Sequence, residues 1–272
     1  MAEEMRADPR FEVREIGPGE LSTAVRAAVE GGAKRVVVAG GDGSIAAAAS
    51  ELLETDAELA VIPAGTLNHF ARDLGIPLEC AAALELAASG TTRPVDLGVV
   101  NGRVFLNTSS VGVYVGYVRR RERMERRLPY RLASFAAGMW SFARVRTFDV
   151  ELEADGEVRH YRTPLVFIGV DERELQFPDL GARKEDGRRG LHVIAMQGKA
   201  RARLLLLAVS AAARGLRVVS RTPHVDSFLV ASCTIHMPKR LGYVALDGEI
   251  ERLETPLRYR LARGALAVVA PA

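Results

Sequence analysis

Cysteine is scarce in this chain, since only Cys80 and Cys233 occur among its 272 residues. The two stand far apart, and neither belongs to a Cys-x-x-Cys or other metal-ligand spacing. This scarcity excludes a disulfide-rich secreted scaffold and a cysteine-based zinc site. We therefore expect a protein of the reducing cytosol.

Long apolar runs are also missing. The longest strongly apolar stretch, residues 204–213, is about half of the roughly 20 residues that a transmembrane helix requires. Residues 1–10 are charged and lack the apolar region of a secretory signal. We expect a cytoplasmic protein that, at most, lies peripherally on the inner face of the membrane.

A charge excess of one sign is nearly absent, because the net charge is only +3. The excess is concentrated between Arg119 and Arg131, a segment with seven Arg and two Glu. Such a basic, partly amphipathic segment could dock on anionic lipid headgroups. A solvated helix with internal salt bridges explains it equally well. A nucleic-acid partner is not expected, because no reading motif accompanies the charge.

The first third of the chain alternates strand and helix patterns. Residues 36–39 and 59–62 are short continuous apolar runs, which are typical of parallel strands buried on both faces. Residues 11–16 alternate with period two and predict a further strand. Helices are predicted over residues 21–30, 45–54 and 78–88, with another ending near residue 74. This rhythm predicts a parallel sheet covered by helices.

The pattern changes after residue 93. Asn101-Gly102 separates two apolar runs and is the strongest short hairpin signal, and Asp155-Gly156 and Asp247-Gly248 are similar turns. Further strands fit residues 164–170, 191–197, 225–230, 233–237, 257–261 and 265–269, with helical insertions near 130–145 and 200–216. The fold class predicted is α/β: a parallel sheet with helices in residues 1–93, followed by an antiparallel β-sandwich-like domain in residues 94–272.

A glycine turn with phosphate-binding character follows the strand predicted over residues 36–39 and begins a helix: Gly40-Gly41-Asp42-Gly43-Ser44. Glycines allow backbone N–H groups to approach a phosphate closely, and a helix N-terminus favours an anion. Asp42 would repel phosphate unless a cation lay between them, so it suggests a Mg²⁺-bridged site. The alternative is a plain strand-to-helix turn that Asp42 or Ser44 caps.

A second glycine turn ends the next predicted strand, at Pro63-Ala64-Gly65-Thr66-Leu67-Asn68. The ends of parallel strands share one edge of a sheet, so both turns can face one ligand. Thr66 and Asn68 would supply neutral hydrogen bonds to a nucleotide, whereas Thr66 alone could simply cap the following helix. Two such turns on consecutive strands favour nucleotide binding.

These residues resemble the catalytic domain of bacterial diacylglycerol kinases and related lipid kinases. The resemblance includes residues 40–44 and 63–77, and continues through Val95-Asp96-Leu97-Gly98, residues 105–112 and Leu246-Asp247-Gly248-Glu249. NAD kinases and phosphofructokinases share the first turn only. The family fold implied is a nucleotide-binding α/β domain followed by a β-sandwich-like domain, with the active site in a cleft between them.

The resemblance also implies roles for individual residues. ATP phosphates and the nucleotide would be held by Gly40, Gly41, Asp42, Gly43, Ser44, Gly65, Thr66 and Asn68. Asp42 and Asp96 would belong to a Mg²⁺ and water network. Glu249 would be the general base that takes a proton from the lipid hydroxyl. Without the resemblance, Glu249 would be an ordinary exposed residue after a hairpin turn.

The sequence departs from the family pattern in three places. The family ordinarily opens with a further strand and helix, which contribute to the nucleotide site, before the segment that matches residues 11–16. His69 stands where many members have Asp, and it either hydrogen-bonds phosphate or simply caps or packs. His192 stands where many members have an Asp that supports a structural metal, so that metal is not predicted here.

The expected activity is phosphorylation of diacylglycerol or a similar lipid at a membrane surface, with ATP and Mg²⁺. One alternative, motivated by these departures, is a catalytically weakened homologue that binds nucleotide or lipid. Another keeps the enzyme class and changes the acceptor to a sphingoid base or another lipid alcohol. The sequence shows no specific lipid-binding motif that separates these acceptors.

Overall fold

The computed structural model describes residues 2–17, 19–112, 147–174, 182–184, 186–196 and 225–271, with a few further positions between 115 and 129. These residues divide into two compact units. The first unit comprises Met1–Leu97 and Ala262–Ala272, and the second comprises Gly98–Leu261. The last residues of the chain therefore return to the first unit.

The first unit is built on parallel strands. β1 (Arg35–Gly40) pairs with β2 (Glu58–Pro63), with Gly40 opposite Pro63. β2 also pairs in parallel with the end of β14 (Leu257–Val269). Four consecutive residues of β2 are buried, as expected of a strand that is covered on both faces. The predicted parallel sheet is confirmed.

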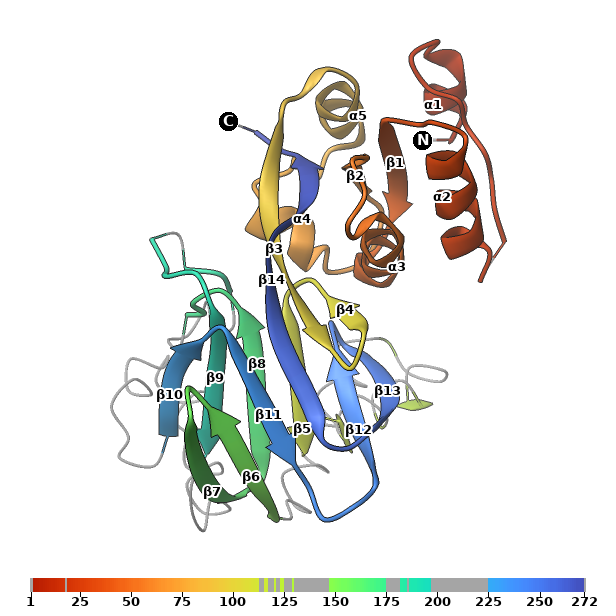
Figure 1. Cartoon of the computed structure of the whole chain (residues 1–272). Coiled ribbons are helices and arrows are strands. Elements are labelled where there is room, and N and C mark those ends of the chain that lie inside the picture. Colours follow the sequence, from red (N-terminus) through yellow and green to blue (C-terminus); the bar gives the residue numbers. More distant parts are fainter. Residues whose placement is uncertain are drawn as a thin grey trace. The chain divides into compact units, whose positions relative to one another are not determined.

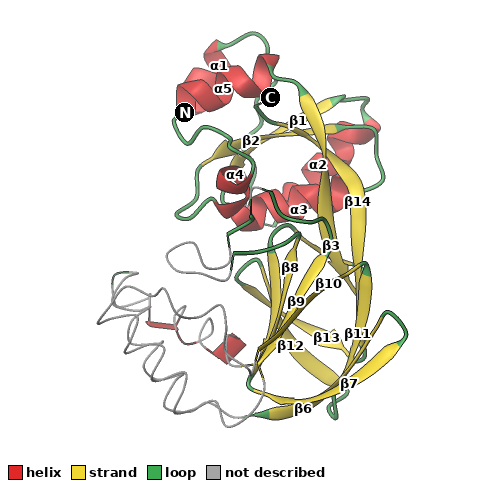
Figure 2. Cartoon of the chain, turned by 90° about the vertical axis from the view of Figure 1, so that its left-hand side faces the viewer, coloured by secondary structure: helices red, strands yellow, loops and turns green. Residues whose placement is uncertain are grey.

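Five helices of the first unit are described: α1 (Ala2–Ala7), α2 (Leu21–Glu30), α3 (Asp42–Leu52), α4 (His69–Asp73) and α5 (Cys80–Ser89). α1 and α5 share one apolar cluster with β2, whereas α3 packs on α2 and on β1 and β2. The two groups of helices lie on the two sides of β1 and β2 (Figure 2). Alternate strand residues therefore meet different helices.

The prediction of a strand over residues 11–16 is wrong. This segment belongs to no strand and pairs with none among the described residues. Phe11 and Val13 instead pack against the cluster of Met5, Ile62 and Leu84. Partial burial of Phe11 and Val13 therefore accompanies the period-two pattern, although the segment forms no strand pairing. The helix α1 was not predicted, and α3 begins at Asp42 rather than at residue 45.

The second unit consists of two antiparallel layers. One layer has the order β10 (Val225–Val230), β9 (Leu191–Met196), β8 (Leu165–Val170), β5 (Thr108–Gly112), β12 (Leu241–Leu246) and β13 (Glu249–Glu254). The other has the first part of β14, then β11 (Ser232–His236), β6 (Phe148–Ala154) and β7 (Glu157–Thr163). A single cluster of buried side chains from both layers forms the core. The predicted sandwich is confirmed, and Figure 1 shows its strands.

Three two-residue turns connect neighbouring strands of this unit as predicted. Asn101-Gly102 joins β3 (Thr92–Val100) to β4 (Arg103–Phe105), Asp155-Gly156 joins β6 to β7, and Asp247-Gly248 joins β12 to β13. Both residues of each turn have positive φ. That is the requirement of a type I′ turn, which Asn-Gly and Asp-Gly meet most readily.

Other predictions differ from the structure or lie outside its description. The strands predicted at 257–261 and 265–269 form one strand, β14, with Gly264 at φ +56 inside it. The helical insertions near 130–145 and 200–216 lie outside the described residues, as do all but four positions between residues 119 and 131. Within the described part of the chain, no helix is both long enough and apolar enough to cross a membrane.

Candidate active site

The glycine turn at residues 40–44 lies where β1 ends and α3 begins. Gly41 is the N-cap of α3 in an extended conformation, and Ile45 makes the first helical bond by donating its N–H to the Gly41 carbonyl at 3.0 Å. The N–H groups of residues 42–44 precede that bond. Among the described residues they have no hydrogen-bond acceptor, so they face outward from the N-terminus of an eleven-residue helix. Such a group of donors suits an anion.

The backbone of the second glycine turn is in direct contact with that of the first. A Cβ atom added to Gly65 would lie 2.5 Å from the Gly41 Cα, and one added to Gly41 would lie 3.2 Å from the Gly65 Cα. The Ala64 N–H also donates to the Gly40 carbonyl at 2.9 Å. The two glycines are therefore required because two backbones touch. The prediction that both turns meet at one edge of the sheet is confirmed by these contacts.

Asp42 reaches from α3 to the start of α4. Its carboxylate accepts the N–H of His69 at 3.1 Å and the N–H of Phe70 at 3.0 Å. These are free donors of the first turn of α4, so Asp42 caps a neighbouring helix rather than its own. The carboxylate stabilises α4 and the second turn, and each oxygen keeps a further lone pair for another donor or a cation.

Asn68 closes the second turn with its own side chain. Its Oδ1 accepts the Gly65 N–H at 2.9 Å, and its Nδ2 donates to the Gly65 carbonyl at 3.0 Å. It adopts the left-handed conformation with φ 51, which Asn tolerates better than most residues. Thr66 and the His69 side chain are exposed. Of the polar residues predicted in this turn, Thr66 is the one at the surface, and Asn68 shapes the backbone.

Asp96 is buried in β3, with 3% of its surface exposed. Its Oδ1 accepts the Gly264 N–H at 2.7 Å, which ties β3 to the left-handed point of β14. A buried carboxylate requires such a donor, because an isolated charge in the interior is costly. The contacts of Asp96 therefore include a structural one, in the same unit as the two glycine turns.

Glu249 belongs to the second unit, where it is the first residue of β13. It is exposed and lies opposite Leu246 across the two-residue turn. Leu246 is buried in the sandwich core, so the backbone of Glu249 is attached to a rigid strand. An exposed carboxylate on such a strand can accept a proton from a bound hydroxyl.

Asp247, in the same turn, holds a distant segment in place. Its carboxylate accepts three consecutive backbone N–H groups, from Leu106 at 2.6 Å, Asn107 at 2.8 Å and Thr108 at 2.9 Å. Its own N–H donates to the Thr108 carbonyl at 2.8 Å. The two motifs at residues 105–112 and 246–249 are therefore joined physically. Sequence reasoning missed this role because Asp-Gly is already explained by its turn.

The anchored segment continues into β5, which is fixed to the opposite layer of the sandwich. The Ser109 hydroxyl hydrogen-bonds the Tyr259 hydroxyl at 3.0 Å. Burial raises the pKa of Tyr259, so this phenol stays neutral and keeps its proton for hydrogen bonding. Figure 1 shows β5 beside β12, whose turn into β13 carries Asp247.

His192, noted above as a departure, is a buried neutral histidine. Its Nδ1 accepts the Arg173 N–H at 2.9 Å, so Nε2 carries the proton and donates to the Ser227 Oγ at 2.7 Å. Burial lowers the pKa of His192. Both ring nitrogens are thus used in holding β9 to its neighbours.

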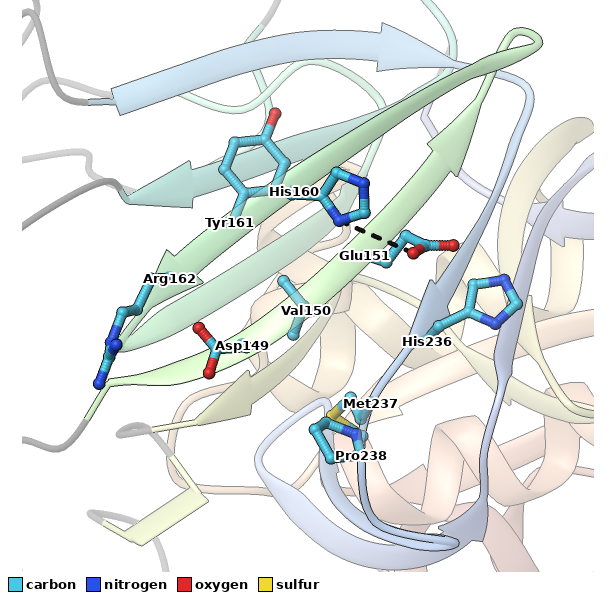
Figure 3. Close-up of a pocket in the computed structure, with 9 residues that line it drawn as sticks. All are labelled: Asp149, Val150, Glu151, His160, Tyr161, Arg162, His236, Met237 and Pro238. Carbon is cyan, nitrogen blue, oxygen red and sulfur yellow. Dashed lines mark ion pairs between the residues drawn. The ribbon is translucent and has the colours of Figure 1, made fainter.

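An open depression is lined by residues 149–151 of β6, 160–162 of β7 and 236–238 at the end of β11 (Figure 3). His160 Nδ1 stands 3.7 Å from Glu151 Oε2, and His236 Nε2 stands 3.8 Å from Glu153 Oε2. These side chains are substantially exposed, so the pairs contribute little to stability. No group of three described His, Cys, Asp or Glu side chains is arranged to hold a metal ion.

Comparison with known proteins gives a family match for most of the first unit. Residues 2–100 match the family described as diacylglycerol kinase catalytic domain. The chain is similar to that family over these residues. The match covers the two glycine turns, α4 and Asp96.

Curated relatives are similar over part of their length. The chain is 46% identical over 96 residues to "Probable lipid kinase YegS-like" of Pseudomonas aeruginosa (strain UCBPP-PA14), which covers 35% of this chain and 32% of the relative. It is 36% identical over 126 residues to "Diacylglycerol kinase" of Bacillus subtilis (strain 168), covering 45% and 42%. The chain thus spans about a third to a half of the curated relatives it matches.

Solved structures share the fold of the diacylglycerol kinase family over most of the chain. A diacylglycerol kinase from Bacillus anthracis str. Sterne matches with a TM-score of 0.67 at 20% identity, covering 95% of this chain and 84% of that one. Another structure from the same strain matches with a TM-score of 0.72 at 22% identity. At these identities the likeness shows the fold alone.

Proposed function

We propose that this chain is an ATP-dependent lipid kinase that transfers the γ-phosphoryl group to the hydroxyl of diacylglycerol or a related lipid. The observation that carries the proposal is the pair of touching glycine turns within the family domain, next to three backbone N–H groups that face outward at the start of α3. The names of the curated relatives support a lipid acceptor.

In this proposal the phosphates of ATP bind at residues 40–44. The N–H groups of Asp42, Gly43 and Ser44 would donate to phosphate oxygens, and the helix dipole adds a partial positive charge. Gly41 and Gly65 allow the close approach of the two backbones, and Gly40 leaves room for the Ser44 side chain. Thr66, exposed on the second turn, would contact the nucleotide.

Asp42 and Asp96 of this unit provide carboxylate oxygens, which are a ligand type that Mg²⁺ uses. Mg²⁺ is usually bound through one or two carboxylates together with substrate phosphates, rather than in an all-protein cage. Asp42 and Asp96 would supply those oxygens, since a carboxylate that accepts backbone N–H groups retains lone pairs. When bound, the ion would neutralise charge on the transferring phosphoryl group.

Glu249 is proposed as the general base. Phosphoryl transfer to an alcohol needs a group that accepts the hydroxyl proton as the oxygen attacks. An exposed carboxylate fixed at the start of a rigid strand meets that need. Attack would form the new oxygen–phosphorus bond, the proton would pass to Glu249, and ADP would leave.

The proposal for the lipid acceptor includes several classes of lipid alcohol. Diacylglycerol, a sphingoid base or another lipid alcohol would each present a hydroxyl at a membrane surface. We place the protein in the cytoplasm, in peripheral contact with the inner membrane face. The segment from Arg119 to Arg131 would contact anionic headgroups.

A second candidate is a catalytically weakened homologue that binds nucleotide or lipid without transferring phosphate. One observation favours it: both oxygens of Asp42 already cap α4. That contact alone explains an Asp in the first glycine turn.

One experiment separates these functions. The chain is incubated with γ-labelled ATP, Mg²⁺ and a panel of lipid alcohols in mixed micelles, beside the Glu249→Gln variant. Transfer to at least one lipid is expected, with a loss of about 10²-fold or more in the variant. Glu254→Gln is the matched control, because Glu254 is an exposed carboxylate on the same strand.

The outcomes distinguish the kinase from the weakened homologue and test the assignment of the base. Binding of ATP without transfer to any lipid selects the weakened homologue. Absence of both transfer and ATP binding overturns the kinase proposal. An equal loss in Glu249→Gln and Glu254→Gln overturns the assignment of the base.

A further inference from the structure

The turn that carries Glu249 is fixed by an unusual set of bonds. Asp247, two residues earlier, accepts the N–H groups of three consecutive residues, 106–108, at 2.6, 2.8 and 2.9 Å. Hydrogen bonds from backbone N–H groups to a carboxylate are about twice as strong as neutral ones. A residue more than 130 positions away in sequence therefore holds this segment and the turn together.

The segment that Asp247 holds is itself rigid. Leu106 is fully buried and Asn107 is 5% exposed. The Asn107 carbonyl accepts the Val170 N–H at 2.9 Å, which ties the segment to the end of β8. The turn is thus anchored to a fixed point in the core and not to a loop.

The connection from Asp247 to Glu249 leaves little freedom. Only Gly248 separates them, and both turn residues have positive φ, at 48 for Asp247 and 91 for Gly248. Glu249 then pairs with Leu246, whose side chain is in the sandwich core. Rotation of the Asp247 carboxylate away from residues 106–108 would shift the turn, and Glu249 would move with it.

We propose that Asp247 is a positioning residue, whose carboxylate fixes the orientation of Glu249 by holding the backbone of residues 106–108. This inference rests on the proposed function, because it takes Glu249 as the base. A displacement of about 1 Å at a reacting group can lower the rate about 10²-fold. Loss of the Asp247 carboxylate should therefore lower kcat, through Glu249, and leave nucleotide binding unchanged.

The chain provides a matched control in Asp155. It occupies the same position of an Asp-Gly turn with positive φ at both residues, in the same unit. It is exposed, and none of the described backbone N–H groups donates to its carboxylate. Asp155→Asn therefore changes the same turn chemistry without removing an anchor.

The test is a double-mutant cycle in which ATP is varied at saturating lipid, so that both kcat and the KM for ATP are measured. Asp247→Asn is expected to lower kcat about 10-fold, with the KM for ATP unchanged, whereas Asp155→Asn leaves both unchanged. In the Glu249→Gln background, Asp247→Asn should lower kcat less than about 2-fold, because the group it positions is already gone. An equal loss in both backgrounds overturns the inference, since a general structural defect would be additive.

A second readout does not depend on activity. Amide hydrogen exchange of residues 106–108 should become about 10-fold faster or more in Asp247→Asn and stay unchanged in Asp155→Asn. Unchanged exchange in Asp247→Asn overturns the anchor whatever the kinetics show. If the wild-type chain transfers phosphate to no lipid, the proposed function fails, and with it the effect on kcat. Exchange then still decides whether Asp247 fixes the turn.

Discussion

The Asp-Gly pairs at residues 42–43 and 247–248 invite comparison, because each belongs to a different unit and each ties two distant segments together. Asp42 starts a helix and accepts two N–H groups from α4. Asp247 lies in a hairpin turn and accepts three N–H groups from residues 106–108. In both, the carboxylate binds backbone that lies far away in the sequence.

A third Asp-Gly pair shows that the dipeptide alone does not produce this role. Asp155-Gly156 forms the same turn as Asp247-Gly248, yet its Asp is exposed and anchors no segment among the described residues. The difference comes from what the fold places opposite each carboxylate. Free N–H groups at a helix start or a bend attract an Asp, whereas a paired strand offers none.

The largest stability effect is expected at Asp247. Asp247→Asn removes the charge and one of two acceptor oxygens, and turns an NH₂ group towards backbone donors. The free energy of unfolding should fall by about 3 kcal/mol, since hydrogen bonds to charged groups contribute about 1.5–3 kcal/mol each. Chemical denaturation measures it, with Asp155→Asn as the control. Equal losses in the two variants would remove the distinction between these turns.

Gly65→Ala tests the contact between the two glycine turns. The new Cβ would lie 2.5 Å from the Gly41 Cα, so one backbone must move, at a cost of about 2 kcal/mol. Gly17→Ala is a suitable control, because its nearest neighbour at 3.2 Å is the end of the flexible Glu20 side chain. The variants are compared by denaturation and by ATP affinity. A Gly65→Ala chain as stable as Gly17→Ala would show that the two turns are not in tight contact.

Asp42→Asn should have a smaller effect on stability than Asp247→Asn. It weakens two capping bonds to a five-residue helix, and loss of an N-cap costs about 1 kcal/mol. Denaturation gives the value, and Mg²⁺-dependent transfer shows whether the carboxylate has a second role. A loss greater than that of Asp247→Asn would reverse the order that the bond counts predict.

The free energy of unfolding should depend on pH because of His192 in the second unit. Burial lowers its pKa below the ordinary value of 6.5, so below that pH the unfolded chain binds a proton that the folded chain does not. Stability therefore falls as pH decreases from about 6.5, by at most about 1.4 kcal/mol per pH unit. His192→Asn should flatten this part of the stability–pH curve. An unchanged slope in denaturation series at pH 7 and 5 would contradict it.

The sequence was sufficient for features with local causes. Asn101-Gly102 and Asp155-Gly156 predicted hairpins because positive φ is a local requirement that few residues meet. The parallel strand β2 was evident because burial on both faces leaves a continuous apolar run. β1 was found from a similar run, although its burial alternates and it ends the strand order of the described sheet. The same logic failed at residues 11–16, where Phe11 and Val13 are half-buried without strand pairing.

Features with distant causes could not be predicted. Nothing near Asp42 indicates that its partners are His69 and Phe70, and nothing near Asp247 indicates residues 106–108. In both places the motif was visible while the bonds that explain its Asp were not. The roles of Asp42, Asp96 and Glu249 in chemistry stay predictions.

The most direct test of the nucleotide site is amide hydrogen exchange with and without excess Mg²⁺ and ATP. The N–H groups of residues 42–44 have no acceptor among the described residues, so bound phosphate should slow their exchange. We expect protection at residues 42–44 and around Thr66, with no change at the Asp155-Gly156 turn. Unchanged exchange at residues 42–44 in the presence of the nucleotide would contradict it.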